Sequence, residues 1–193
     1  MKNVLGALSA IAALCAMPAL ADTEHTGFFI GGGVSNFDLD IKYVNEDLSA
    51  TGFTLYGGYN FSNWFGIEAS VNAATDLGDN NSDLTAAAII VGPKFSYNLN
   101  DTITLFAKAG LANVAVIDNY YAEDMGDWDW GDEADYSGLG YSYGLGSHFA
   151  VTKHLNIRLA YEYISAELDA DSSYFYDIDT ELSVFSLGLH YQF

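Results

Sequence analysis

The last twelve residues, LSVFSLGLHYQF, place a large apolar side chain at every second position. The apolar positions are Phe185, Leu187, Leu189, Tyr191 and Phe193. A period of two is that of a β-strand, because successive side chains of a strand point to opposite faces. One face of this segment is therefore apolar, and the other carries small and polar residues.

The same alternation recurs along the chain. It is regular in residues 51–61, 64–74, 102–112, 139–149 and 155–163, and less regular near 27–37 and 84–97. Aromatic and β-branched residues are frequent in these segments, which favours strands over helices. Together with the terminal segment, the pattern predicts eight strands.

The predicted connections are of two kinds. Three are short, at 62–63, 98–101 and 152–153, and four are long, at 38–50, 76–83, 118–137 and 169–181. Short and long connections alternate strictly along the chain. This is the arrangement of an up-and-down antiparallel barrel in which all long loops leave one rim and all short turns leave the other.

Charge follows the same division. The formal net charge is −20, and 20 of the 26 acidic residues fall in the predicted long connections. Such a charge argues against nucleic acid as a partner, because phosphates are bound by Lys and Arg. Yet half of the residues are hydrophobic. After the first twenty or so residues no apolar run is long enough for a transmembrane helix, so the apolar content must reside in alternating strands.

The N-terminal residues have the composition of a secretory signal. Lys2 precedes an apolar run from Val4 to Leu14, and Ala19-Leu20-Ala21 resembles a cleavage site. We expect a signal peptide over residues 1–21 and a barrel domain over residues 22–193. The single cysteine, Cys15, would then be removed with the signal, which leaves no thiol and no disulfide in the mature chain.

Two eight-stranded barrels are compatible with alternation. A soluble, lipocalin-like barrel points its apolar face inward, and a membrane barrel points it towards lipid. Eight strands enclose a space just wide enough for side chains, which is too small for the apolar residues of every strand. The membrane barrel is therefore favoured, with the polar face lining the lumen.

Charged residues within the predicted strands all lie on the polar face. They are Glu68, Lys94, Lys108, Arg158 and Glu162. A charge facing lipid near the midplane would cost roughly 2–4 kcal/mol for Arg or Lys. We expect these residues to form an ion-pair network in the lumen, since isolated buried charges are costly. The network is read either as a structural plug or as a gate on a path for small ions.

Aromatic residues gather beside the short turns. They are Phe61, Trp64, Phe65, Phe95, Tyr97, Phe149, Tyr191 and Phe193. A girdle of aromatics marks the membrane–water interface of transmembrane barrels. The pattern predicts that the short turns and both termini are periplasmic, and that Phe193 ends the last strand at that interface.

With the segment LGLHYQF at its end, the chain resembles bacterial outer-membrane β-barrel proteins. It resembles the small eight-stranded group that includes the barrel of outer membrane protein A, outer membrane protein X and the opacity-type adhesins. The resemblance implies that Leu187, Leu189, Tyr191 and Phe193 form the signal read by the barrel-assembly machinery. The same residues are also expected to face lipid. The periplasmic peptidoglycan-binding domain of some relatives is expected to be absent.

The predicted outer loops carry the remaining candidates. Aromatic candidates for contact with a protein or glycan partner are Tyr120, Tyr121, Trp128, Trp130, Tyr136, Tyr174, Phe175 and Tyr176. Asp127 and Asp129 with Gly131 resemble the start of a calcium-binding loop, although no Glu stands at the twelfth position. A third interpretation is a solvated acidic loop without a ligand.

Catalysis has little support in the sequence. Ser147 and His148 are neighbours on a predicted strand, so their side chains point to opposite faces. No cofactor is expected. The chain is therefore interpreted as a non-enzymatic outer-membrane protein that acts in surface interaction, adhesion or envelope structure. The alternative is a narrow-pore or porin-like channel with a charged lumen. Expected partners are outer-membrane lipid, the assembly machinery and a host or surface ligand.

Overall fold

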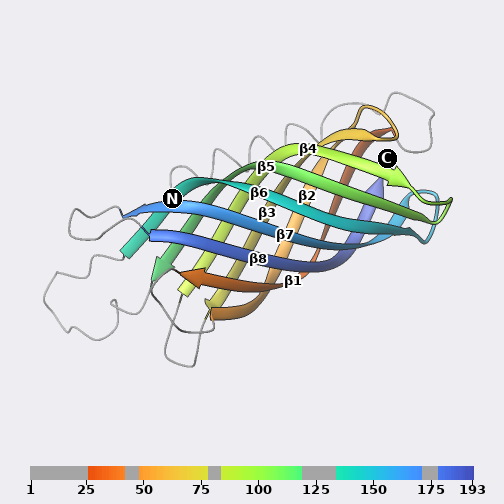
Figure 1. The fold of residues 1–193 in the computed structure, drawn as a ribbon. Coiled ribbons are helices and arrows are strands. Elements are labelled where there is room, and N and C mark those ends of the chain that lie inside the picture. The colour runs from red at the N-terminus through yellow and green to blue at the C-terminus, as the bar shows by residue number, and fades with distance from the viewer. Residues whose placement is uncertain (1–25, 42–47, 78–83, 119–133, 171–177) are drawn as a thin grey trace, which may run out of the picture.

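A computed structural model describes residues 26–41, 48–77, 84–118, 134–170 and 178–193, which form a closed antiparallel barrel (Figure 1). Its eight strands are β1 (Gly27–Ile41), β2 (Leu48–Asn60), β3 (Phe65–Leu77), β4 (Leu84–Asn98), β5 (Ile103–Asp118), β6 (Ala134–Ala150), β7 (Leu155–Ala170) and β8 (Ile178–Gln192). Each strand pairs with its neighbours in the chain, and β1 pairs with β8 to close the barrel. The predicted eight-stranded up-and-down barrel is confirmed.

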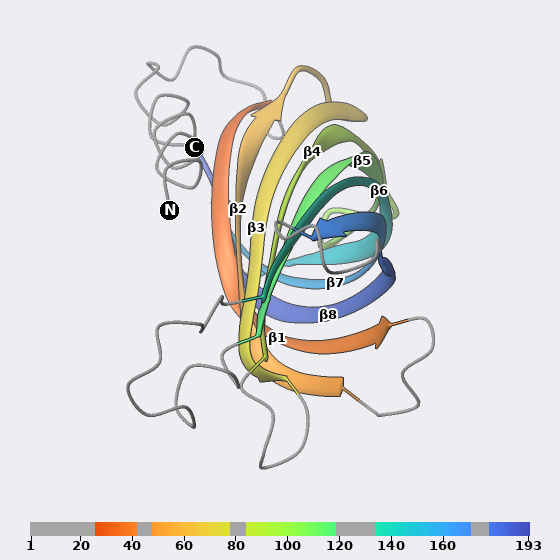
Figure 2. The ribbon, with the colours of Figure 1, turned by 90° about the vertical axis from the view of Figure 1, so that its left-hand side faces the viewer.

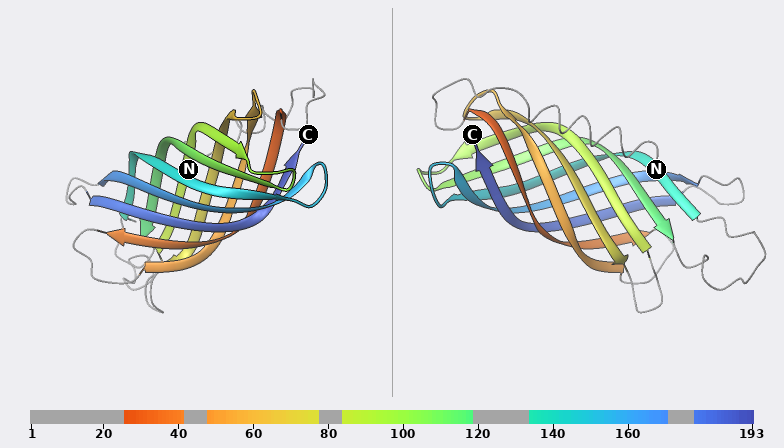
Figure 3. Two further views of the ribbon diagram at one scale, coloured as in Figure 1. Left: turned by 45° about the vertical axis from the view of Figure 1, so that its right-hand side comes forward. Right: turned by 180° about the vertical axis from the view of Figure 1, so that it is seen from behind.

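Three tight connections lie at one end of the barrel, called here the turn end. They join β2 to β3, β4 to β5 and β6 to β7, and Phe193 lies at the same end (Figures 1 and 3). Backbone hydrogen bonds of 2.9 Å close the turns from Phe61 to Phe65, from Leu99 to Ile103 and from Val151 to Leu155. The opposite end, called the far end, is where the other four pairs of strand ends meet.

The strands are longer than the alternation predicted. At the far end, β1, β3, β5 and β7 continue to Ile41, Leu77, Asp118 and Ala170. Residues 38–41, 48–50, 134–137 and 178–181 are therefore strand rather than loop. The predicted long connections were therefore too long, on both sides for 38–50, 118–137 and 169–181 and on the N-terminal side for 76–83. Strands of 15–17 residues in β6, β7 and β8 exceed the ~9–11 that a tilted strand needs to span a bilayer.

The outer surface of the barrel is apolar around its middle and at the turn end. On β8, Phe185, Leu187, Leu189 and Tyr191 all point outward and are 43–55% exposed. Outward residues of other strands form the same belt, among them Ile30, Leu55, Ile67, Val91, Leu111, Tyr141 and Ile157. Within the described residues, no helix is long and apolar enough to cross a membrane.

Towards the far end the polarity of the two faces is inverted, most clearly in β1, β7 and β8. In the segment FDLDI of β1, Phe37 and Leu39 are buried in the lumen while Asp38 and Asp40 are exposed. Glu167 on β7 and Glu181 on β8 are likewise exposed beside buried leucines. Alternation continues, but the apolar side chains now point inward. This inversion explains why the acidic residues suggested loops.

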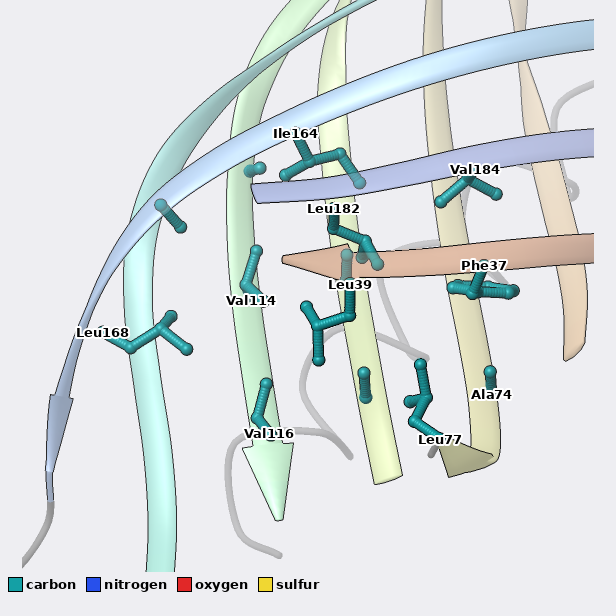
Figure 4. Packing of buried hydrophobic residues seen from close by; sticks show 14 of the residues in the cluster. Phe37, Leu39, Ala74, Leu77, Val114, Val116, Ile164, Leu168, Leu182 and Val184 are labelled. Atoms are coloured by element: carbon teal, nitrogen blue, oxygen red, sulfur yellow. The ribbon is translucent and has the colours of Figure 1, made fainter. Parts of the chain in front are cut away.

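The inverted strands enclose an apolar core in the lumen. The core consists of Phe37, Leu39, Leu48, Ala74, Leu77, Ala86, Ala88, Ile90, Ala112, Val114, Val116, Ile164, Ala166, Leu168, Leu182 and Val184, called here the apolar cluster. Figure 4 shows these side chains converging from β1, β3, β5, β7 and β8 on one interior. The expectation of a polar lumen is therefore wrong for the far half of the barrel. Figure 2, viewed from the left-hand side of Figure 1, shows the strands curving around a common interior.

Candidate functional site

The five charged residues predicted for the lumen come together there. Glu68, Lys94, Lys108, Arg158 and Glu162 lie on inward positions of β3, β4, β5 and β7, and each is at most 8% exposed. They are called here the ion-pair cluster. Its three cations and two carboxylates leave one positive charge in excess.

Glu68 is the centre of the ion-pair cluster. Arg158 donates two hydrogen bonds to it, from Nη1 to Oε2 at 2.9 Å and from Nη2 to Oε1 at 2.8 Å. Lys108 Nζ donates to Oε1 at 3.1 Å, whereas Lys94 Nζ lies 3.7 Å from Oε2. Lys108 also pairs with Glu162 at 2.9 Å. Lys94 is thus the most loosely paired of the three cations.

Aromatic rings complete the surroundings of the cations. The Arg158 guanidinium lies 3.8 Å from the centre of the Tyr56 ring and 4.5 Å from that of Phe106, and Lys94 Nζ lies 3.5 Å from that of Phe29. Cations over ring faces are stabilised by the quadrupole of the ring. Sequence reasoning did not identify these three rings. Their signal was a large aromatic side chain on the otherwise small and polar face of a strand.

Glycines make room for these rings. A Cβ at Gly146 would lie 2.5 Å from Cζ of Phe106, and a Cβ at Gly58 would lie 2.6 Å from Cζ of Phe29. Both distances are shorter than carbon–carbon contact allows. The inward glycines therefore permit large rings to fill a narrow lumen beside the charges.

A hydroxyl and amide chain connects β1, β2 and β3 inside the lumen. Thr54 Oγ1 donates to Asn72 Oδ1 at 2.7 Å, and Ser35 Oγ lies 2.6 Å from Thr54 Oγ1. Because the single hydroxyl hydrogen of Thr54 is used towards Asn72, Ser35 must be the donor to Thr54. All three side chains are buried, so the chain ties three strands together away from water.

The lumen is thus layered along the barrel axis. On β7, the inward residues from the turn end are Asn156, Arg158, Ala160, Glu162 and Ile164. Asn156 lines a cavity, Arg158 and Glu162 belong to the ion-pair cluster, and Ile164 belongs to the apolar cluster. The ion-pair cluster therefore separates a cavity at the turn end from the apolar cluster towards the far end.

The cavity at the turn end is polar and encloses about 700 Å³; it is called here the turn-end cavity. Its walls are made largely of hydroxyl and amide side chains, among them Asn60, Ser96, Asn98, Thr104, Asn156 and Gln192. Lys94, His148 and His190 line its inner end, and Lys153 and Asp101 lie at its mouth. Sequence reasoning did not predict a cavity at this end of the barrel.

His148 and His190 stand side by side, with ring centres 4.3 Å apart. The rings are 7% and 3% exposed, and they pack against Phe106 and Phe29 respectively. His148 Nε2 and His190 Nδ1 have no hydrogen-bond partner. In the described part of the chain, no three His, Cys, Asp or Glu side chains are grouped as metal ligands would be.

Most of the predicted outer-loop candidates lie outside the described residues. These are Tyr120, Tyr121, Asp127, Trp128, Asp129, Trp130, Tyr174, Phe175 and Tyr176. Tyr136 is described, on β6, where it is half-buried and packs against the apolar cluster. This packing makes Tyr136 part of the barrel interior rather than a freely projecting anchor.

The predicted assembly residues line the outside of β8. Leu187, Leu189, Tyr191 and Phe193 are all exposed, and the rings of Tyr191 and Phe193 meet edge to face at 5.0 Å. The Phe193 N–H donates to the Phe28 carbonyl at 2.9 Å, which fixes the end of the chain against β1. Their role as a recognition signal stays a prediction.

Aromatic side chains gather at the turn end, as the sequence predicted. Ring contacts run from Tyr59 to Phe61, from Phe61 to Phe65 and from Phe65 to Phe95, and Trp64 contacts both Phe65 and Phe95. The rings of β2, β3 and β4 thereby form a continuous band on the outer surface of the barrel. A band of this kind suits the interface between lipid and water.

Comparison with known proteins gives the fold family. A model of the outer membrane protein beta-barrel domain matches residues 7–193. Neisserial surface protein A superposes with a TM-score of 0.67 at 15% identity, covering 86% of this chain and 97% of that one. Ail, the attachment invasion locus protein of Yersinia pestis, gives 0.60 at 20% identity, covering 88% and 99%. Outer membrane protein OprG from Pseudomonas aeruginosa gives 0.61 at 15% identity, covering 89% and 99%. No curated protein matches the chain.

Proposed function

The chain belongs to the outer membrane protein beta-barrel family, and from this premise we propose that it is a non-enzymatic surface protein of the bacterial outer membrane. Residues 1–21 would serve for export, and residues 22–193 would form the barrel. Short turns are periplasmic in outer-membrane barrels, so the turn end would lie at the periplasmic interface and the far end outside the cell. Function would then be exerted at the far end, in adhesion, in other surface contacts or in envelope structure.

One observation carries this proposal: the far half of the lumen is filled with apolar side chains. The apolar cluster contains sixteen residues, and Phe37, Leu39, Leu77, Val114, Ile164, Leu168 and Leu182 are each at most 2% exposed. Water and ions do not pass a packed apolar interior without opening it. The far half of the described barrel is thus filled, and its rim would be the surface available to a partner.

The far end of the barrel extends beyond the length needed for the bilayer. This extension is called here the collar. Five exposed carboxylates lie on its part of β1, β7 and β8: Asp38, Asp40, Glu167, Asp179 and Glu181. Asp40 is directly opposite Glu181, and Glu167 is opposite Asp179. Charged side chains on the outer surface are costly in lipid, so they support a collar that stands in water. An apolar core inside would keep it rigid.

The chemistry of the collar bears on the kind of partner. Ail has been crystallised with the heparin analogue sucrose octasulfate, which is a polyanion. A chain with a net charge of −20 and an acidic collar would repel such a ligand. A surface contact of this protein is therefore proposed to involve a neutral or basic partner.

A channel is the second candidate. The polar turn-end cavity supports a half-channel open to the periplasm. The ion-pair cluster and the apolar cluster close its inner end, so passage would require both to rearrange. This makes a permanently open, porin-like pore the weaker proposal. Eight strands also leave little space for a water-filled path.

The test compares three versions of the protein in a strain that lacks it. They are the full chain, a version with residues 119–133 and 171–177 replaced by tight turns, and a Glu162→Gln control whose change lies inside the lumen. Folding is checked by heat-modifiable gel mobility, and adhesion to host cells and matrix is measured. Adhesion that falls only with the shortened connections supports the proposal. Equal adhesion in all three would remove the interaction function for those surfaces.

A further inference from the structure

The turn-end cavity collects positive charge in a strongly acidic protein. The Lys and Arg residues of the described chain are Lys94, Lys108, Lys153 and Arg158. Three of them belong to the ion-pair cluster at the inner end of the cavity, and Lys153 stands at its mouth. The outer surface of the collar, by contrast, is acidic. Small ions that enter from the turn end therefore meet a positive inner wall.

Lys94 is the cation of the ion-pair cluster that lines the cavity. Lys108 and Arg158 make close hydrogen bonds to carboxylates, whereas Lys94 Nζ is 3.7 Å from Glu68. Lys94 lines the cavity although the residue is only 1% exposed. A buried ammonium that is incompletely neutralised is stabilised by an additional anion.

The two histidines supply further unused hydrogen-bonding capacity. His148 Nε2 and His190 Nδ1 are buried without partners, and both residues line the cavity beside Lys94. A buried polar atom without a partner costs free energy that a ligand can recover. Each imidazole can present an N–H at the unpartnered nitrogen through the choice of tautomer.

The positive charge near His148 and His190 favours an anion over a metal cation as the ligand. Two neutral imidazoles alone can hold a transition metal, but here Lys94 lines the same space and belongs to an ion-pair cluster with an excess of positive charge. Asp101 and the carboxylate of Phe193 lie at the mouth of the cavity, and Glu68 lies behind Lys94, where the three cations of the ion-pair cluster outweigh the cluster's two carboxylates. They do not reverse the sign of the inner end.

We infer that the turn-end cavity is a binding site for a small soluble oxyanion, of the phosphate or carboxylate class, held by Lys94, His148 and His190. The inference is independent of the function proposed for the far end. The ligand would enter from the side of the short turns. Hydroxyls such as those of Ser96 and Thr104 in the cavity wall provide donors along the way. Lipid headgroups are separated from this space by the wall of the barrel.

The experiment uses the folded mature protein in a non-ionic detergent. Inorganic phosphate and acetate are titrated separately at constant ionic strength, with sodium chloride as the balancing salt. The measured quantities are the ¹⁵N shifts of the imidazole nitrogens, assigned with His148→Gln and His190→Gln. Saturable shifts at His148 and His190, but not at His154 near the mouth, are expected with at least one oxyanion. Absence of such shifts with both probes overturns the inference.

Variants separate binding from a general electrostatic effect. Lys94→Gln is expected to weaken binding by at least about tenfold, since charge-assisted hydrogen bonds are the strong ones. Lys153→Gln, which removes the same charge at the mouth, is expected to change affinity by less than about threefold because exposed charges are screened. Equal effects of the two variants would overturn the assignment to Lys94.

A second variant covers the case in which Lys94→Gln does not fold. Ser96→Glu adds a carboxylate to the cavity wall two residues from Lys94 and leaves the ion-pair cluster intact. It is expected to abolish the oxyanion-dependent shifts while the gel mobility of the folded barrel is kept. Undiminished shifts in folded Ser96→Glu would contradict a site at this position.

Discussion

Arg158 on β7 and Glu68 on β3 form a bidentate ion pair between opposite sides of the barrel. Its hydrogen bonds run from Nη2 to Oε1 at 2.8 Å and from Nη1 to Oε2 at 2.9 Å. The pair therefore spans the lumen instead of joining neighbouring strands. Strand pairing holds each residue to its neighbours along the wall. This contact adds a tie across the interior, and Lys94 and Lys108 extend it to β4 and β5.

Glu68→Gln is expected to destabilise the barrel much more than Glu162→Gln. Glu68 faces three cations, whereas Glu162 pairs with Lys108 alone. Removing one partner of a buried ion pair costs about 3–5 kcal/mol because the remaining charge is left uncompensated. Urea unfolding in lipid vesicles gives the two free energies. A loss for Glu68→Gln no larger than that for Glu162→Gln would show that Glu68 is not the centre of the network.

Neutralising the ion pair is expected to leave the barrel non-conducting. In the double variant Glu68→Gln with Arg158→Gln, the apolar cluster still fills the far half of the lumen. Planar-bilayer recordings should therefore show the same baseline as the unchanged protein. The recording is informative only if the variant keeps its folded gel mobility. Stepwise single-channel currents in this variant would mean that charge, and not the apolar cluster, closes the lumen.

Gly146→Ala is expected to destabilise the barrel by roughly 1–3 kcal/mol, as overpacking of a filled core does. The added Cβ would lie 2.3 Å from the Leu159 carbonyl oxygen and 2.5 Å from the Phe106 ring, which lies against the Arg158 guanidinium. Gly57→Ala is the matched control, because its Cβ would meet nothing nearer than the Phe29 carbonyl oxygen at 3.3 Å. Thermal unfolding followed by gel mobility compares them. Equal midpoints would contradict the tight packing around Gly146.

An Arg placed on the outer apolar belt is expected to destabilise the barrel more, the closer it lies to the middle of the bilayer. Leu111→Arg, at a side chain 72% exposed in the middle of β5, should cost ~2–4 kcal/mol in a bilayer. Tyr97→Arg, near the turn end of β4, should cost only ~0–1 kcal/mol. Unfolding in vesicles measures both. In a detergent without defined thickness, the difference between the two variants should shrink. A larger cost for Tyr97→Arg than for Leu111→Arg in vesicles would contradict the position assigned to the apolar belt.

Phe193→Ala is expected to lower insertion into the outer membrane of cells while leaving refolding into detergent intact. The backbone hydrogen bond from Phe193 to Phe28 does not need the side chain, so the folded barrel keeps its closure. Folded protein is quantified by gel mobility from membranes and from refolding reactions. An equal loss in both settings would assign the ring a structural role instead of recognition by the assembly machinery.

The alternation of the sequence was sufficient for the barrel and for its outward face. Leu187 and Leu189 were placed correctly because period two in a strand leaves only two faces. The charges of the ion-pair cluster were found by the same reasoning. Asp38, Asp40 and Glu181 were assigned to loops, because charge density is usually a sign of loops. The segment FDLDI nevertheless carried the signal of the inverted faces.

The pairing within the lumen was beyond sequence reasoning. Which cation meets Glu68 depends on the stagger of β3 against β7, and that stagger is set by the register of every strand between them. The turn-end cavity depends on the same stagger. A pattern of alternation fixes the face of each residue, but not its height along the barrel axis.

Closure of the barrel by β1 and β8 also determines how the protein must be made. The register joins Phe29 to Gln192, so the decisive contact is between the two extremes of the barrel sequence. Such high contact order makes folding slow and postpones any stable intermediate. Until the last strand arrives, β1 is an unpaired edge that can template aggregation. We therefore expect the chain to stay unfolded until all eight strands can pair, and we expect binding of the unfolded chain by a chaperone to reduce its aggregation.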